Sequence, residues 1–72
     1  MKTDVSIKFN SIEEYREIEK KLEELGYVLL LDDKSNKGYV MVNNNSKTFG
    51  KFEYILSINI HQYNSLKEFL KD

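Results

Sequence analysis

The sequence predicts a single small α+β domain, residues 1–72, in which one main helix packs on one face of a mostly antiparallel sheet. Three observations lead to this prediction: a helical pattern at residues 11–25, several short segments of alternating apolar residues, and a chain of only 72 residues. A helix with one apolar stripe must bury that stripe against another element, and alternating segments form sheets. Hydrophobic residues make up 40% of the chain, which is enough for one core.

The helix is predicted at residues 11–25 because its start, its apolar face and its end are all visible in the sequence. Ser11 and Glu14 form a capping-box pattern at the start. Gly26 can adopt the left-handed conformation that ends a helix. Apolar residues recur at helical spacing and are expected to form one buried stripe, which consists of Ile12, Tyr15, Ile18, Leu22 and Leu25.

Four strands are predicted around the helices, in the order β-α-β-β-β-α. Residues 5–9 alternate between apolar and polar, and the apolar runs 27–31 and 39–42 are separated by a polar turn. The clearest alternation, at residues 52–60, predicts a long fourth strand after a second turn at 43–48. We expect strands two to four to form an antiparallel meander, with strand one added at an edge through the helical crossover.

A second, shorter helix is predicted from Ser65, because Ser65 and Glu68 repeat the capping-box pattern. It offers Leu66, Phe69 and Leu70 for docking. Both alternations of strands two and three are apolar, so the sheet face opposite the first helix also needs a cover. The second helix is the simplest cover, and a partner chain is the alternative.

Composition excludes several classes of protein. The chain has no cysteine, so disulfides and thiolate metal sites are excluded and a reducing compartment is expected. No apolar run reaches the roughly 18 residues of a membrane span, and no apolar segment follows the N-terminus, so we expect a cytoplasmic protein with no membrane contact. The net charge of −1 argues against tight, non-specific binding to nucleic acid.

The sequence contains no recognisable pattern for catalysis. The only histidine is His61, and without a cysteine or a nucleophile motif it predicts no catalytic triad. Asp32 and Asp33 lie in a predicted turn that lacks the ligand spacing of a calcium loop. The three glycines are isolated and form no phosphate-binding pattern. We therefore expect a non-enzymatic protein with no catalytic residue, no cofactor and no metal.

Charge is segregated along the chain and provides two candidate binding surfaces. The first helix carries six glutamates, and Glu13, Glu17 and Glu24 lie away from its apolar stripe, where they would present phosphate-like charge to a basic partner. Residues 34–52 carry four lysines and no acid. This second surface has the ingredients for stacking and neutralising single-stranded nucleic acid, in the residues Lys34, Lys37, Tyr39, Lys47, Phe49 and Lys51.

The segment Ile7-Lys-Phe-Asn-Ser-Ile-Glu-Glu-Tyr15, followed by Leu22-Glu-Glu-Leu-Gly-Tyr27, resembles the start of many small proteins encoded by phages and mobile elements of AT-rich bacteria. The resemblance covers the N-terminal third of the chain. It implies a small, non-enzymatic accessory protein, in a class that includes anti-CRISPR inhibitors. The leading hypothesis is therefore an inhibitor that binds a host protein or ribonucleoprotein complex in the host cytoplasm, without contacting nucleic acid directly.

Two alternatives remain open from the sequence. One is a small regulatory or nucleic-acid-binding protein that uses the basic residues 34–51. The other is a structural homodimer that pairs through the second face of the sheet. The charge pattern alone does not distinguish the acidic helix from the basic hairpin as the binding surface.

Overall fold

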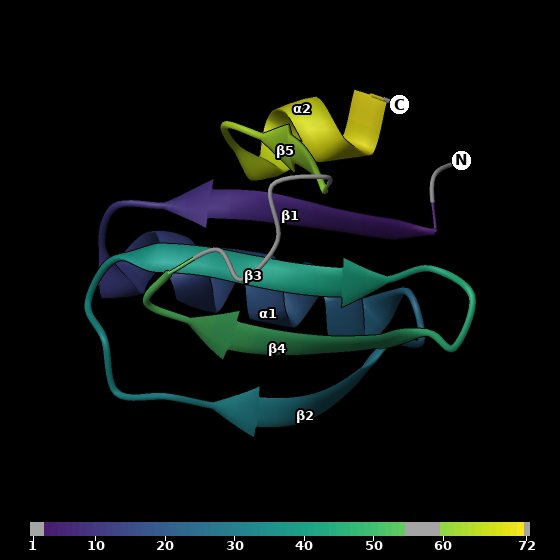
Figure 1. Ribbon diagram of the computed structural model, residues 1–72, viewed down its shortest axis with the longest axis horizontal. Helices are drawn as coiled ribbons and strands as arrows, with labels where there is room; N and C mark the ends of the chain where they lie inside the picture. The colour runs from purple at the N-terminus through teal and green to yellow at the C-terminus, as the bar shows by residue number, and fades with distance from the viewer. Residues whose placement is uncertain (1–2, 55–59, 72) are drawn as a thin grey trace.

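The computed structural model describes residues 3–54 and 60–71. Its elements are β1 (Asp4–Phe9), α1 (Ile12–Glu24), β2 (Val28–Asp32), β3 (Gly38–Asn43), β4 (Thr48–Phe52), β5 (His61–Tyr63) and α2 (Leu66–Lys71). The five strands form one mixed sheet in the order β2-β4-β3-β1-β5, with α1 packed on one face (Figure 1). The small α+β fold predicted from the sequence is confirmed, but the sheet has five strands rather than four. It is mixed rather than mostly antiparallel, because β1 pairs parallel with β5 and β2 pairs parallel with β4.

Helix α1 begins as its sequence predicts. The Ser11 hydroxyl accepts a hydrogen bond from the backbone N–H of Glu14 at 3.2 Å. In return, the Glu14 carboxylate accepts one from the N–H of Asn10 at 3.1 Å. This reciprocal pair is a capping box, which satisfies N–H groups that have no partner inside the helix. Most of the predicted stripe then packs on the sheet, with Tyr15, Ile18 and Leu22 buried and Ile12 partly buried.

The end of α1 is a Schellman motif, and it changes which residue continues the apolar stripe. Gly26 has a φ of +95°, and the N–H of Tyr27 donates to the carbonyl of Leu22 at 2.9 Å. This turn carries Tyr27 into the core, whereas Leu25 remains 46% exposed. The prediction that Leu25 is buried is wrong, because the chain leaves the helical path before this last position reaches the sheet.

The predicted meander of strands two to four is wrong. β3 lies between β1 and β4 and runs antiparallel to both, whereas β2 lies outside β4 and runs parallel to it. The prediction that strand one lies at an edge is also wrong: β1 is interior, with β5 parallel to it at the edge opposite β2. β3 occupies the centre because Val40 and Val42 are buried between their neighbours on both sides. β2 lies at an edge of the sheet, and four of its five residues are exposed there.

The long strand predicted for residues 52–60 is wrong over the part that the structure describes. β4 begins at Thr48, the last residue of the predicted second turn, and ends at Phe52. Glu53 and Tyr54 form a bend, and residues 55–59 lie outside the described residues. The Asp33 carboxylate accepts the N–H of Glu53 at 3.1 Å, so this N–H finds its partner outside the sheet.

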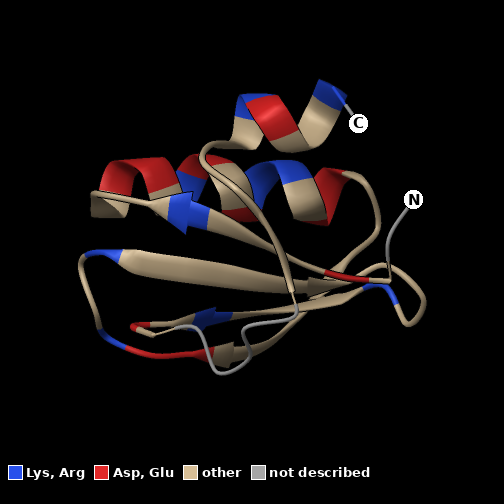
Figure 2. Ribbon diagram, turned by 45° about the horizontal axis from the view of Figure 1, so that its top comes forward, with Lys and Arg blue, Asp and Glu red and all other residues tan. Residues whose placement is uncertain are grey.

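Both helices lie on the same face of the sheet (Figure 2). In α2 the predicted capping box forms, with the Ser65 hydroxyl accepting the N–H of Glu68 at 3.2 Å. Phe69 is buried against Tyr63 of β5, with ring centroids 5.6 Å apart, but Leu70 stays exposed, contrary to the prediction. Neither described helix covers the opposite face of the sheet, so the expectation that α2 would cover it is also wrong.

Candidate binding surfaces

The three glutamates predicted to bind a partner lie on the exposed side of α1. Glu13, Glu17 and Glu24 are all exposed, and helical geometry places them along one side. Lys20 is also exposed and lies on this side, between Glu17 and Glu24. Figure 2 accordingly shows basic as well as acidic segments along α1. The mixed charge makes this surface a poor copy of a row of phosphates.

The six residues predicted as a nucleic-acid surface do not form one surface. Phe49 and Lys51 are buried, with exposed fractions of 2% and 3%. Lys47 lies in the turn between β3 and β4, whereas Lys34 and Lys37 lie in the loop that leads into β3. These two loops are at opposite ends of β3. A continuous basic hairpin, as the sequence predicts, is therefore absent from the described part of the chain.

Lys51 is buried because of the register of β4. It pairs with Val40, and side chains in register on neighbouring strands point to the same face, here the face that α1 covers. Its Nζ lies 4.6 Å from the ring centroid of Tyr15 and 3.7 Å from a carboxylate oxygen of Asp32. A buried charge is costly unless it has a partner, and the aromatic ring and the carboxylate provide two.

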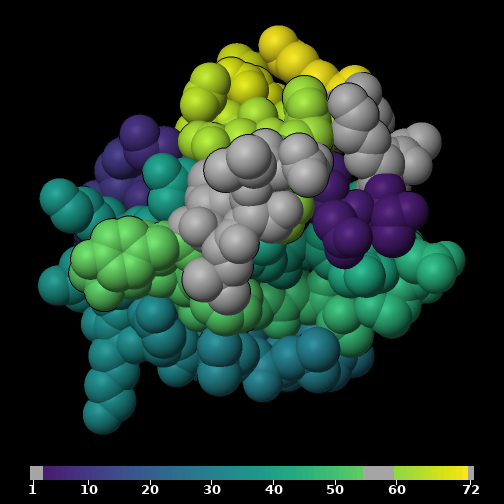
Figure 3. Space-filling model, in the orientation of Figure 1, coloured from purple at the N-terminus to yellow at the C-terminus, as the bar shows by residue number. Residues whose placement is uncertain are grey.

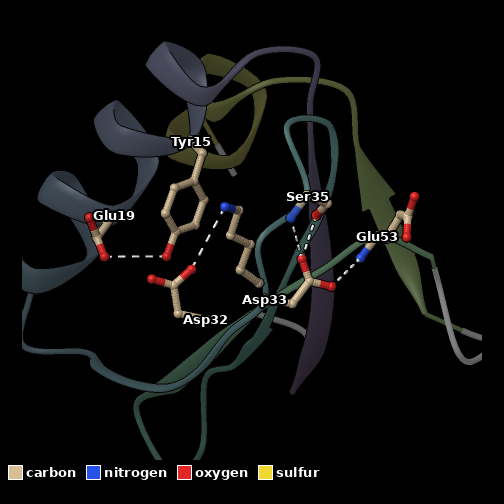
Figure 4. Close-up of polar contacts among 7 residues, drawn as sticks. Tyr15, Glu19, Asp32, Asp33, Ser35 and Glu53 are labelled. Carbon is tan, nitrogen blue, oxygen red and sulfur yellow. Dashed lines mark hydrogen bonds and ion pairs between the residues drawn. The ribbon is translucent and has the colours of Figure 1, made fainter.

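Lys51, Asp32, Tyr15 and Glu19 form one cluster. The Tyr15 hydroxyl donates a hydrogen bond to the carboxylate of Glu19 at 3.3 Å (Figure 4). Burial raises the pKa of Tyr15 well above its ordinary value, and the carboxylates of Glu19 and Asp32 raise it further. The phenol therefore remains a protonated hydrogen-bond donor at neutral pH. These contacts tie α1 to β2 and β4, so we interpret the cluster as structural.

Lys51→Met is expected to leave the free energy of unfolding within about 1 kcal/mol of the wild-type value. Methionine keeps a long side chain against the aromatic rings, and losing a buried ammonium group removes a desolvation cost. Lys51→Ala removes the packed stem as well and should cost about 2 kcal/mol or more. Urea denaturation of both variants measures the difference. A methionine variant as unstable as the alanine variant would show that the charge itself holds the cluster.

Asp33 organises the loop between β2 and β3. Its carboxylate accepts hydrogen bonds from the backbone N–H and the hydroxyl of Ser35, and from the N–H of Glu53 (Figure 4). The hydrogen bonds from Ser35 hold the pKa of Asp33 below its ordinary value. The hydrogen bond from Glu53 ties the bend after β4 to the loop between β2 and β3.

β2 exposes apolar side chains along an edge of the sheet. Val28, Leu30 and Leu31 have exposed fractions of 59%, 70% and 48%. Within the described residues β2 pairs only with β4, and the register shifts between Leu29 and Leu31, which leaves Leu30 without a counterpart on β4. In Figure 3, β2 runs along the lower border of the molecule with its outer edge uncovered. An exposed apolar edge of this kind is where another strand can add.

An apolar groove continues from this edge onto the sheet face opposite α1. Its volume is about 160 Å³, and its lining includes Leu31 of β2, Met41 of β3, and Gly50 and Phe52 of β4. The absence of a side chain at Gly50 keeps this groove open, because a Cβ there would lie 2.9 Å from the ring of Phe52. The edge and the groove together form one apolar surface, which we call the β2 surface.

A second, more polar hollow lies where β1 ends and β3 begins. It brings together Lys37 and Tyr39 from the predicted nucleic-acid set with Lys8 and Tyr54. Sequence reasoning did not find Lys8 or Tyr54 as site residues, because only strand pairing and the bend after β4 bring them close. By contrast, the residues of the β2 surface had a visible signal, namely the apolar run at 27–31.

Known proteins do not identify the chain: no protein-family model, curated protein or solved structure matches it. Within residues 3–54 and 60–71, no group of three or more histidine, aspartate and glutamate side chains is arranged to hold a metal ion. No helix in the described residues has the length and apolar character to cross a bilayer. His61 is exposed at the start of β5, with its ring 4.5 Å from that of Tyr63.

Proposed function

We propose that this chain is a non-enzymatic protein-binding module that works as a phage-type inhibitor, and that it binds its partner through the β2 surface. The observation that carries the proposal is the exposure of Val28, Leu30 and Leu31 on an unpaired edge. These side chains contribute little to the core, and contiguous exposed apolar residues typically mark interaction sites.

The geometry of the edge favours binding by strand addition. A strand of the partner would form main-chain hydrogen bonds with the outer edge of β2, while its side chains would contact Leu30 and the neighbouring groove. Leu30 is 70% exposed and lies at the bulge, in the middle of the strand. It is therefore the residue that we expect to contribute most to binding.

Acidic side chains near the β2 surface support a basic partner. Asp32 is the last residue of β2 and Asp33 follows it in the loop, so two carboxylates lie at the end of this strand. A host protein that handles nucleic acid presents a basic surface, and charge complementarity speeds and orients association. The partner that fits best is therefore a host protein or ribonucleoprotein complex with an exposed strand beside a basic channel.

Leu30→Lys is expected to abolish partner binding, because a lysine on an edge opposes strand addition and apolar contact. The matched control is Leu25→Lys, since Leu25 is also exposed but lies outside β2. Affinity capture from a lysate of an AT-rich bacterial host, with mass spectrometry, compares both variants with the wild type. We expect a specific protein to be captured by the wild type and by the Leu25 variant and lost with the Leu30 variant. Equal capture by all three would contradict the proposal.

Reversing Glu13, Glu17 and Glu24 to lysine tests the acidic surface of α1. We expect this triple variant to associate with the captured partner several-fold more slowly, with a stability loss within about 1 kcal/mol because these charges are exposed. Neutralising the exposed Lys34, Lys37 and Lys47 should change association less. Surface plasmon resonance measures the association rate of each variant. A larger loss of association in the lysine variant than in the glutamate variant would favour the nucleic-acid-binding alternative.

A further inference from the structure

A hollow of about 400 Å³ lies at the end of the sheet where β1 ends and β3 begins. Both of these strand ends are at the left in Figure 1. The strand register builds one wall of it. Lys8 pairs with Tyr39, and both alternate with core residues, so their side chains lie side by side on the face opposite α1. Both are half-buried. This pair is thus held by the sheet itself rather than by a loop.

Three connecting segments supply the rest of the hollow. Lys37 comes from the loop before β3, Glu53 and Tyr54 come from the bend after β4, and Asn10 comes from the turn before α1. Tyr54 is 70% exposed, although it is a large aromatic residue. Neither the core nor the β2 surface accounts for this exposure. The Asp33 carboxylate accepts the N–H of Glu53, so the backbone of the bend is held at the residue before Tyr54.

The side chains of the hollow have the chemistry that recognises a nucleotide. Tyr39 and Tyr54 offer aromatic faces on which a base can stack, and stacking requires no particular base. Lys8 and Lys37 offer two ammonium groups for phosphate oxygens. The amide of Asn10 can both donate and accept hydrogen bonds. Glu53 is the one acid among these lining residues, so the hollow keeps a net positive charge.

We propose that this hollow binds a nucleobase with its phosphate, supplied by single-stranded nucleic acid. Its volume falls within the range of small-ligand pockets and suits about one nucleotide. An acidic peptide would satisfy the lysines but would leave the two tyrosine faces without a stacking partner. Because only two lysines contact phosphate, we expect a low affinity that depends only slightly on salt concentration. This agrees with the net charge of −1. The site is separate from the β2 surface and does not depend on the proposed inhibitor function.

The test is a fluorescence anisotropy titration of the intact chain with a short, labelled oligothymidylate. We expect saturable binding. The logarithm of the association constant should fall linearly with the logarithm of the salt concentration, with a slope of about −1.4, because two phosphate contacts are formed. Tyr54→Ala should weaken binding by about five- to a hundredfold, whereas Tyr54→Phe, which keeps the aromatic face, should bind like the wild type. Because Tyr54 is exposed, neither change should disturb the fold, and circular dichroism checks this.

The lysines provide a matched comparison. Lys37→Ala should reduce the salt slope by about 0.7, whereas Lys34→Ala, which removes a charge from the same loop but outside the hollow, should leave the slope unchanged. Competition with thymidine monophosphate distinguishes single-stranded nucleic acid from a free nucleotide as the ligand. Weak competition supports single-stranded nucleic acid. Competition as strong as that of unlabelled oligonucleotide shows a site for a free nucleotide instead. No saturable binding, an unaffected Tyr54→Ala variant, or stronger binding of oligoglutamate would overturn the proposal. The Leu30→Lys variant should bind the oligonucleotide normally, which separates this test from that of the β2 surface.

Discussion

Leu22→Ala is expected to lower the free energy of unfolding by about 2–5 kcal/mol. Leu22 is 0% exposed and belongs to the stripe that α1 packs against the sheet, together with Tyr15 and Ile18. Truncation removes buried methyl groups and leaves a cavity between the helix and the sheet, because the surrounding strands can close around it only in part. Urea denaturation monitored by circular dichroism measures the loss.

Leu25→Ala is the control for this experiment. Leu25 lies on the same helical pattern but is 46% exposed, so its truncation should change stability by no more than about 0.5 kcal/mol. The two leucines are three residues apart and undergo the same chemical change, so the difference between them reports burial. A loss below about 1 kcal/mol for Leu22→Ala would mean that α1 does not pack on the sheet through this stripe.

Gly38→Ala is expected to destabilise the protein by about 3 kcal/mol, at the upper end of the usual range for single substitutions. A Cβ at this position would lie 2.2 Å from the carbonyl oxygen of Phe52 and 2.9 Å from the Cα of Glu53. Both neighbours are backbone atoms, and Asp33 holds the N–H of Glu53, so they cannot rotate away as a flexible side chain would. The φ of Gly38, +155°, is also rarely adopted by other residues.

Gly26→Ala separates the contribution of the clash from that of the backbone conformation. Gly26 has a φ of +95°, but a Cβ there would meet no atom within 4 Å. Its substitution should therefore cost only the left-handed strain, about 1–2 kcal/mol. Thermal and urea unfolding of the two variants give the comparison. Equal losses at both positions would indicate that the close approach at Gly38 is relieved by a small backbone shift.

Sequence patterns predicted the local features of this protein correctly. The capping boxes at Ser11 and Ser65, the glycine that ends α1, and the buried face of β1 are all decided by residues within a few positions of one another. Such features depend on backbone hydrogen-bond satisfaction and on the period of the element, which can be read directly from a sequence. Leu25 shows the limit of this reasoning, because the periodicity continues beyond the point where the Schellman turn redirects the chain.

Part of the β2 surface was also foreseeable. The run at residues 27–31 is apolar on both alternations, which predicts that one of its faces needs a cover beyond the main helix. What the sequence could not show was that this run lies at an edge of the sheet. That position exposes Leu30 and makes strand addition the expected mode of binding.

By itself, then, the sequence determined the α+β class, the two capped helices and the buried face of β1. Only the tertiary structure decided the strand order, the end of β4 at Phe52, the burial of Lys51 and the meeting of Lys8 with Tyr39. The physical reason is that pairing partners and register depend on contacts between residues far apart in the chain. A pairing one strand away, or a register shifted by one residue, sends the same side chain to another neighbour or to the other face of the sheet.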